Sequence, residues 1–469
     1  MKLYSEGDSY KLYQGNMLDM LEVIPPNSID SIVTDPPYGL TSIVERFGKE
    51  GSAPAQEGKD GSFARLSKGF MGKEWDGSGV EYNIDTWRKC YTVLKSGGYL
   101  VAFGGTRTFH RIACAIEDAG FEIRDTIMWL YGSGFPKSMN IGLAIDKKLG
   151  VESEVVGSLG TMPDFQDAGQ KNTVNKIGVN DGDTAERKEQ LIRKASNEWD
   201  GWGTCLKPAY EPIIIARKPC EGSCVDNVLK YGVGGINIDE CRIPISQDIA
   251  TPANEQGRFP SNVILTYDET DRDEVCGRMP ETGGWGHDKD CAHLGGLGDS
   301  GSAARYFYCA KASKKDRDEG LENFETKNTG ELQGGRQEGS AGSIMQNADG
   351  TTRLNPYAGT GAPKRNVHPT VKPTELMQYL VRLVTPKGGT VLDPFNGSGS
   401  TGKATLWENK ERGADYKYVG IELTEEYLPI AKARLDYVRT VNLNQDTTNT
   451  DGTPDTDISQ VRMVTRKLF

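Results

Sequence analysis

The stretch that decides the fold is Thr390-Val-Leu-Asp-Pro-Phe-Asn-Gly-Ser-Gly399, an apolar strand pattern that runs into a glycine-rich turn. A helix pattern follows, and then a further strand, Tyr418 to Ile421, which ends at Glu422. This order of strand, glycine turn, helix, strand and acidic residue is the layout of a nucleoside-binding half of an α/β sheet. Gly397 and Gly399 allow the backbone to approach a ligand closely, and Glu422 stands where a carboxylate accepts both ribose hydroxyls.

A second motif, Asp35-Pro-Pro-Tyr38, ends a β-branched run, Ile29 to Thr34, that reads as a buried strand. The exocyclic amine of adenine or cytosine is a poor nucleophile because its lone pair is delocalised into the ring. A carboxylate and a carbonyl that accept its two N–H groups make that lone pair available to an electrophile. The two prolines hold the Pro36 carbonyl rigidly, and Tyr38 can stack on a base turned out of a duplex. The same tetrapeptide can also be a plain turn at the end of a strand.

Strand and helix patterns alternate through residues 29–131 and again through 363–438, whereas residues 220–362 show little periodicity. Alternation of this kind favours layers of helices around a mostly parallel sheet. We therefore expect an α/β protein, with residues 220–362 as a separate, loop-rich domain.

The composition limits the classes of protein to which the chain can belong. The 469 residues include 55 Lys and Arg against 66 Asp and Glu, so the formal net charge is −11. Any contact with nucleic acid must then come from local basic groups. No apolar run approaches the roughly 18 residues that a membrane span requires, and we expect a cytoplasmic protein of a bacterium or a phage-infected host cell, without membrane contact.

These motifs resemble those of the β-group exocyclic-amino DNA methyltransferases, a family that uses S-adenosylmethionine. The matching stretches are Asp35-Pro-Pro-Tyr38, Asp393-Pro-Phe-Asn-Gly-Ser-Gly399, His368-Pro-Thr-Val-Lys-Pro373 and Gly420-Ile-Glu422. The catalytic motif precedes the glycine turn, which is the circularly permuted order of this group. The resemblance implies a doubly wound, Rossmann-like sheet of about seven strands, assembled from both ends of the chain around the inserted, loop-rich domain. Phage and prophage members of the family look particularly similar.

The resemblance implies transfer of a methyl group from S-adenosylmethionine to the amine of a flipped base in double-stranded DNA, with N6 of adenine favoured. It implies that Asp35 holds the amine, that Pro36 and Pro37 present a rigid carbonyl, and that Tyr38 stacks on the base. The residues that the resemblance assigns to cofactor binding are Asp19, Thr370, Lys372, Asp393, Phe395, Asn396, Gly397, Ser398, Gly399 and Glu422.

The resemblance also implies a division of the chain, in which a restriction-modification type of enzyme reads its target through the inserted domain. The expected parts are a catalytic part at 1–219 with a mobile loop at 41–80 and an insertion at 132–206, a target-recognition domain at 220–362, a cofactor-binding part at 363–440 and a polar tail at 441–469. Two basic groups are candidates for phosphate contacts. They are Arg187, Lys188, Arg193, Lys194, Lys207, Arg217 and Lys218, and then Lys311, Lys314, Lys315 and Arg317.

Several alternatives stay open at this stage. The target can be N4 of cytosine, the substrate can be RNA or a protein side chain, or the chain can be an inactive DNA-binding module. The sequence also leaves the oligomeric state open between a monomer and a homodimer. Gly397-x4-Gly402-Lys403 mimics a phosphate-binding loop, but Ala404 stands where Ser or Thr would reach Mg²⁺. We expect reduced thiols and no metal, although one group of Cys and His residues leaves structural zinc open. That group is Cys220, Cys224, His287, Cys291 and His293.

Overall fold

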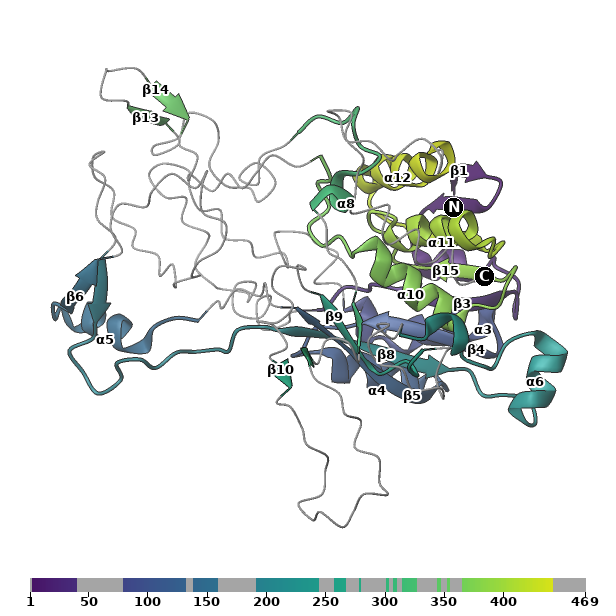
Figure 1. Cartoon of the computed structure of the whole chain (residues 1–469), viewed down its shortest axis with the longest axis horizontal. Coiled ribbons are helices and arrows are strands. Elements are labelled where there is room, and N and C mark those ends of the chain that lie inside the picture. The colour runs from purple at the N-terminus through teal and green to yellow at the C-terminus, as the bar shows by residue number, and fades with distance from the viewer. Residues whose placement is uncertain are drawn as a thin grey trace, which may run out of the picture.

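The two ends of the chain build one body in the computed structural model (Figure 1). The structure describes residues 2–39, 79–131, 138–158, 191–243, 257–266, 278–279, 301–302, 307–309, 314–326, 344–346, 352–354 and 365–441. Nearly all of the expected loop at 41–80, most of 220–362 and all but the first residue of the tail at 441–469 lie outside the described residues.

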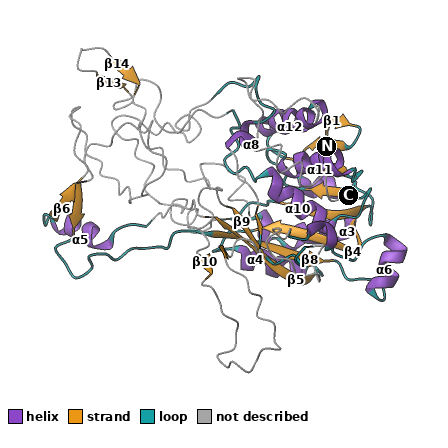
Figure 2. Ribbon diagram, in the orientation of Figure 1, coloured by secondary structure: helices purple, strands orange, loops and turns teal. Residues whose placement is uncertain are grey.

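Ten of the described strands form one sheet, in the order β1-β2-β16-β15-β3-β4-β8-β5-β9-β12 (Figure 2). Their bounds are β1 Lys2–Gly7, β2 Tyr10–Gln14, β3 Ile29–Thr34, β4 Leu94–Phe103, β5 Glu122–Tyr131, β8 Tyr210–Arg217, β9 Val263–Thr266, β12 Tyr308–Cys309, β15 Thr390–Asp393 and β16 Lys417–Glu422. Three small sheets pair β6 Glu154–Ser158 with β7 Leu191–Lys194, β10 Arg278–Met279 with β11 Gly301–Ser302, and β13 Ile344–Gln346 with β14 Thr352–Leu354.

The centre of the large sheet matches the expected architecture. Strands β2, β16, β15, β3 and β4 are parallel neighbours, and β8 runs antiparallel between β4 and β5. Three further strands extend this group beyond the expected size: β1 pairs with β2 in a hairpin, while β9 and β12 continue the opposite edge. Both β9 and β12 come from within residues 220–362, so this part of the chain contributes to the main sheet.

Alternate side chains of each strand point to opposite faces of the sheet. Apolar side chains lie on both faces, and helices cover both. Val33 and Val101 pack in one core with α10–α12, and Ile32 and Leu100 pack in another with α1, α3 and α4. The sheet is therefore doubly wound, as expected. The helices are α1 Met17–Leu21, α3 Ile84–Val93, α4 Phe109–Asp118, α5 Ile141–Leu149, α6 Cys224–Tyr231, α8 Lys314–Asp318, α10 Thr374–Val384, α11 Ser400–Arg412 and α12 Leu428–Thr440, with short 3₁₀ turns η3 Val80–Tyr82, η4 Asp239–Cys241 and η7 Glu425–Tyr427.

Neighbouring strands β3 and β15 join segments that are far apart in the sequence. Val391 and Leu392 lie in register with Ser31 and Ile32. The buried Ser31 hydroxyl lies 2.8 Å from that of Thr385, and a carboxylate oxygen of Asp30 accepts the Thr390 amide at 2.8 Å. These bonds fix the register, so the carboxyl ends of β3 and β15 lie side by side.

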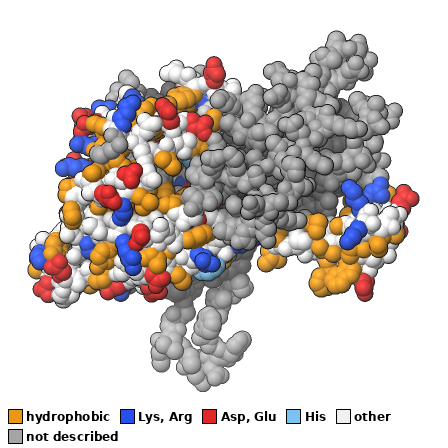
Figure 3. Space-filling model, turned by 180° about the vertical axis from the view of Figure 1, so that it is seen from behind, with side chains coloured by type: hydrophobic (Ala, Val, Ile, Leu, Met, Phe, Trp, Pro, Cys, Tyr) orange, Lys and Arg blue, Asp and Glu red, His pale blue; other side chains and the backbone are white. Residues whose placement is uncertain are grey.

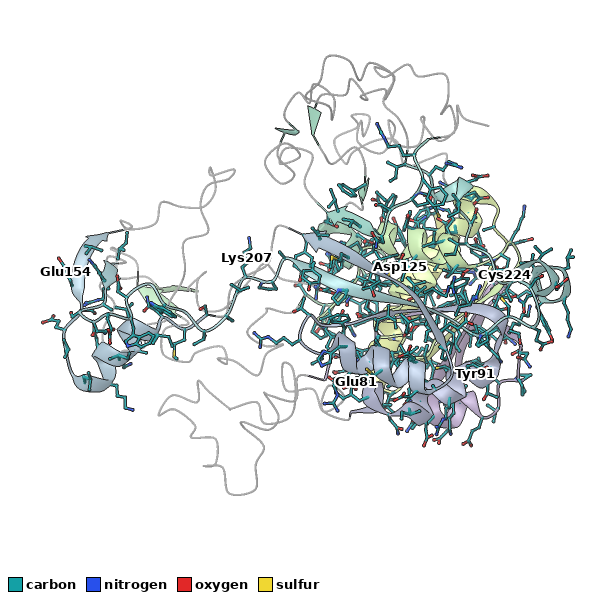
Figure 4. The ribbon with its side chains drawn as sticks, turned by 90° about the horizontal axis from the view of Figure 1, so that it is seen from below. Glu81, Tyr91, Asp125, Glu154, Lys207 and Cys224 are labelled. Carbon is teal, nitrogen blue, oxygen red and sulfur yellow. The ribbon has the colours of Figure 1, made fainter. Side chains whose placement is uncertain are left out.

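The insertion between β5 and β8 is more regular than its polar sequence predicted. Its described residues, 138–158 and 191–209, contain α5 and the antiparallel strand pair β6–β7. They lie apart from the main sheet (Figures 1 and 4). Figure 4 shows Glu154 in this lobe and Lys207 on the segment that leads back to the sheet. Asp146 is buried and accepts the Ser196 amide and the Asn197 side chain at 2.8 and 2.6 Å. None of the helices in the described ranges could cross a membrane.

Candidate active site

The two sequence motifs meet at the carboxyl edge of the sheet. Asp35 follows β3 directly, and Asp393 is the last residue of the neighbouring strand β15. The Thr34 hydroxyl donates to Asp393 Oδ1 at 2.6 Å, and the same oxygen accepts the Phe395 amide at 3.1 Å. Burial raises the pKa of Asp393 to about 6. The tetrapeptide and the glycine turn are therefore joined through a buried hydrogen bond between adjacent strand ends.

Four side chains from three segments form the centre of the site: the tetrapeptide after β3, the start of β8 and the residue before Pro373 and α10. Lys372 Nζ lies 2.6 Å from Asp35 Oδ2 and 3.4 Å from Glu211 Oε2. The Tyr38 hydroxyl lies 3.0 Å from Asp35 Oδ1 and 2.7 Å from Glu211 Oε2, so it can donate its proton to either carboxylate. Lys372 Nζ also lies 4.9 Å from the centre of the Phe103 ring. We call Asp35, Tyr38, Glu211 and Lys372 the carboxylate–lysine cluster.

Burial and neighbouring charges set the protonation of this cluster. Burial raises the pKa of Asp35, and Glu211 adds to the rise while Lys372 opposes it. Burial works against the charge of Lys372, yet Asp35 and Glu211 together raise its pKa above the ordinary value. Burial and the two carboxylates hold the pKa of Tyr38 well above 10.0, so its hydroxyl stays neutral and acts as a donor.

Hydrogen bonds from outside the tetrapeptide hold its backbone. The Tyr82 hydroxyl donates to the carbonyls of Tyr38 and Gly39 at 2.8 and 2.7 Å, and the Thr108 hydroxyl donates to the Tyr38 carbonyl at 2.7 Å. Gly39 has a φ of +53°, and a Cβ there would come within 1.9 Å of a Glu81 carboxylate oxygen. Only glycine therefore fits this position, and the motif is fixed at its carboxyl end as well as by its prolines.

The glycine turn is closed by the acidic residue at the end of β16. Glu422 accepts the Gly397 amide at 2.6 Å and the Thr424 amide at 2.7 Å, and burial raises its pKa to about 7. Gly397 has a φ of +50°, and a Cβ there would lie 2.8 Å from His368 Nε2. The turn therefore depends on glycine for its backbone conformation and for its closeness to the His368 ring.

The other residues assigned to cofactor binding lie around this turn. Asp19 is exposed in the first turn of α1, whose preceding Gly15 amide donates to the Glu422 carbonyl at 3.0 Å. Phe395 is half-buried, with its ring centre 6.5 Å from that of Trp87. Asn396 accepts the Tyr418 hydroxyl, Ser398 accepts Arg434, Gly399 precedes α11, and the backbone of Thr370 contacts the His368 ring.

Glu211 is the member of the cluster that sequence reasoning missed. The apolar run from Tyr210 to Ala216 indicates a strand, and none of its residues is among the expected site residues. Because β8 is antiparallel to its neighbours, its first residues lie at the same edge of the sheet as the carboxyl ends of β3 and β4. A carboxylate at the start of an otherwise apolar strand was the available signal. Lys372, which the resemblance assigned to cofactor binding, forms ion pairs with Asp35 and Glu211.

Residues of two other sequence patterns, the stretch that mimics a phosphate-binding loop and the group of Cys and His residues, make contacts within the described part of the protein. Lys403, in the stretch that mimics a phosphate-binding loop, is fully buried and pairs with Asp316 and Glu319 at 2.6 and 2.8 Å. The sulfurs of Cys220 and Cys224 lie 3.7 Å apart, but no group of three or more potential metal ligands occurs among the described residues. His287, Cys291 and His293 lie outside that part of the chain.

Two of the basic residues expected to contact phosphates are buried, which corrects that expectation. Arg217 pairs with Glu122 at 2.7 Å, and Lys218 Nζ donates to Asn27 and to two backbone carbonyls. Both are engaged in holding the strands together. On the face shown in Figure 3, basic and acidic side chains are interspersed over the described part of the main body.

Comparison with known proteins shows the family to which the chain belongs. The family model for N6 and N4 methyltransferases, described as DNA methylase, matches residues 29–433. The chain belongs to this DNA methylase family. It is 24% identical to the type II methyltransferase M.HindIII of Haemophilus influenzae over 245 residues, which are 48% of this chain and 64% of that protein. It is 24% identical to the type II methyltransferase M.SfiI of Streptomyces fimbriatus over 449 residues, 90% of each chain.

Among solved structures, the cytosine-N4-specific PvuII DNA methyltransferase aligns with 94% of this chain and 92% of its own. The TM-score is 0.40 and the sequence identity 13%.

Proposed function

We propose that this protein transfers the methyl group of S-adenosylmethionine to the exocyclic amine of a base in double-stranded DNA, and that the base is adenine. The observation that carries the proposal is the meeting of the Asp35 tetrapeptide with the glycine turn across β3 and β15. Membership of the DNA methylase family supports the same reaction.

The residues around the turn suit S-adenosylmethionine. The positive φ of Gly397 leaves a bend without a side chain, and the buried Glu422 carboxylate beside it can accept ribose hydroxyls. Asp19 lies exposed on α1 near the same strand end and can accept the adenine amine. When bound, S-adenosylmethionine supplies an electrophilic methyl group on a positively charged sulfur.

The cluster then acts on the target base. The Asp35 carboxylate accepts one N–H of the amine and the Pro36 carbonyl accepts the other, which directs the nitrogen lone pair toward the methyl group. The nitrogen becomes positive as its bond to carbon forms, and the negative charge of Asp35 stabilises it. The extra proton on the methylated amine leaves through Asp35 to solvent. Positioning and electrostatics supply the catalysis, so no covalent enzyme intermediate is needed.

We further propose that residues of 220–362 outside β9 and β12 read the target sequence, and that the enzyme acts in the cytoplasm of its host. Arg193, Lys194 and Lys207 are the described members of the mid-chain basic group that are exposed, and we propose them for phosphate contact.

The proposal is tested by incubating the purified chain with tritiated S-adenosylmethionine and unmethylated genomic DNA, with RNA in parallel. Asp35→Ala, purified in the same way, controls for contaminating enzymes. We expect label in DNA only, and N6-methyladenine after digestion. N4-methylcytosine would correct the target base, while label in RNA alone, or equal transfer by Asp35→Ala, would overturn the proposal.

A further inference from the structure

Two carboxylates share one lysine at the centre of the site. Lys372 Nζ pairs with Asp35 at 2.6 Å and has Glu211 within 3.4 Å, and its side chain is 6% exposed. The Tyr38 hydroxyl lies between the same two carboxylates. Each donor therefore has two acceptors within reach, one on β8 and one after β3.

The arrangement conflicts with the task that the proposed function gives to Asp35. Lys372 Nζ donates to Oδ2 of Asp35, and the Tyr38 hydroxyl lies 3.0 Å from Oδ1, so a donor already stands near each oxygen when an amine arrives. An ammonium beside Asp35 also opposes the positive charge that develops on the target nitrogen, and the opposition is strong where water is scarce. Lys372 must leave Asp35 for the reaction to proceed, and a buried ammonium needs another partner when it does so.

We propose that Glu211 is a positioning residue that receives Lys372 and keeps the Tyr38 hydroxyl when the target base binds, and so frees Asp35 for the amine. The inference rests on the proposed function. The transfer requires only a small movement of Lys372 Nζ, because Glu211 Oε2 is already 3.4 Å away and Tyr38 already lies 2.7 Å from the same oxygen.

The fold keeps the receiving carboxylate in place. Glu211 lies opposite Trp129 of β5, and the adjoining residues of β8, from Ile213 onward, pair with β4 on the other side. Its side chain is 22% exposed, so it is sheltered but reachable from the site. Lys372 immediately precedes Pro373 and α10. The Lys372 side chain is longer than that of Glu211, and it is the side chain that moves. A negative charge accompanies the ammonium at both ends of that movement, so the charge of the cluster does not change.

Removal of the Glu211 charge has a signature that mere loss of packing does not share. The groups that face Asp35 and Glu211 are Lys372, Tyr38, Tyr131 and Asp393. Because Glu211 raises the pKa of Asp35, its loss lowers that pKa. In wild type the rate falls at low pH as Asp35 takes up a proton, and this fall is the acid limb of the pH–rate profile. In the variant without the Glu211 charge, the acid limb moves to lower pH.

The test compares wild type with Glu211→Gln, Glu211→Asp and the control Glu122→Gln. Glu122 begins β5 at the opposite edge of the sheet and pairs with Arg217. Initial rates of tritium transfer to genomic DNA give kcat and KM between pH 5.5 and 8.5, and calorimetry gives cofactor affinity. We expect Glu211→Gln to lower kcat about thirty-fold or more with cofactor affinity unchanged and the acid limb at lower pH. Glu211→Asp recovers part of the rate and keeps the wild-type limb.

Each other result overturns the inference. These results are a wild-type rate in Glu211→Gln, an acid limb that does not move, a loss in Glu211→Asp as large as in Glu211→Gln, or a parallel loss of cofactor affinity. Should Glu211→Gln fail to fold, the rate and limb of Glu211→Asp decide. If the wild type transfers no methyl group in the same assay, the proposed function is refuted instead. The wild-type rate therefore distinguishes failure of the proposed function from failure of the inference about Glu211.

Discussion

Gly397→Ala tests the glycine turn at its tightest point. An alanine in the left-handed region costs about 1–2 kcal/mol relative to glycine. Its Cβ would also lie 2.8 Å from His368 Nε2 and 3.2 Å from Cε1. The His368 ring is buried against Tyr427, with ring centres 4.6 Å apart, so it cannot yield freely. The overlap adds about 1–3 kcal/mol, typical of overpacking.

Gly413→Ala is the matched control, since Gly413 ends α11 with a φ of +63° and a Cβ there would meet nothing within 4 Å. Urea unfolding should give a larger loss for Gly397→Ala than for Gly413→Ala. Calorimetry should show at least about a tenfold loss of S-adenosylmethionine affinity in Gly397→Ala alone, because each tenfold corresponds to about 1.4 kcal/mol. Equal unfolding losses together with full cofactor affinity in both variants would refute the role given to this turn.

The remaining predictions concern charge and reactivity. Burial raises the pKa of Glu422 to about 7, so its carboxyl is ionised above that pH; cofactor affinity measured by calorimetry should fall as pH drops below 7, and Glu422→Gln should remove this dependence. Arg382→Met should destabilise the fold by about 3–5 kcal/mol in urea, because Glu408 is fully buried against it, whereas Arg88→Met at an exposed pair should cost under about 1 kcal/mol. Bonds from Cys220 and Arg217 lower the pKa of Cys224, whereas burial raises that of Cys90 to about 12, so peptide mapping should find Cys224 alkylated by iodoacetamide long before Cys90.

Local patterns singled out the candidate residues that lie within one segment, and the roles of these residues in the reaction stay predictions. Asp35 and Tyr38 stand in a four-residue motif after a strand. Gly397 lies in the turn of one strand–turn–helix–strand unit, and Glu422 ends that unit. The expectation that the tetrapeptide and the glycine turn meet in space came from the family resemblance, because the order of the two motifs matches that family. Glu211 could not be placed in this way, because its position depends on the antiparallel direction of β8, which only long-range pairing reveals.

The edges of the sheet were also hard to predict. Strand β9 has four residues and β12 has two, too few for a two-residue period to be recognised within an irregular sequence. Strand β4 begins at Leu94 and includes Gly97 and Gly98, although a Gly-Gly pair is more typical of a turn between elements. There, Gly97 donates its amide to the Lys218 carbonyl, a pairing between distant parts of the chain.

The most direct test of the central claim is a crystal structure of the chain with S-adenosylmethionine bound. We expect the ribose to contact Glu422, the cofactor to cross the Gly397 bend, and its methyl group to point toward Asp35 and the Pro36 carbonyl. A cofactor held at another edge of the sheet, or a methyl group directed away from Asp35, would contradict the central claim.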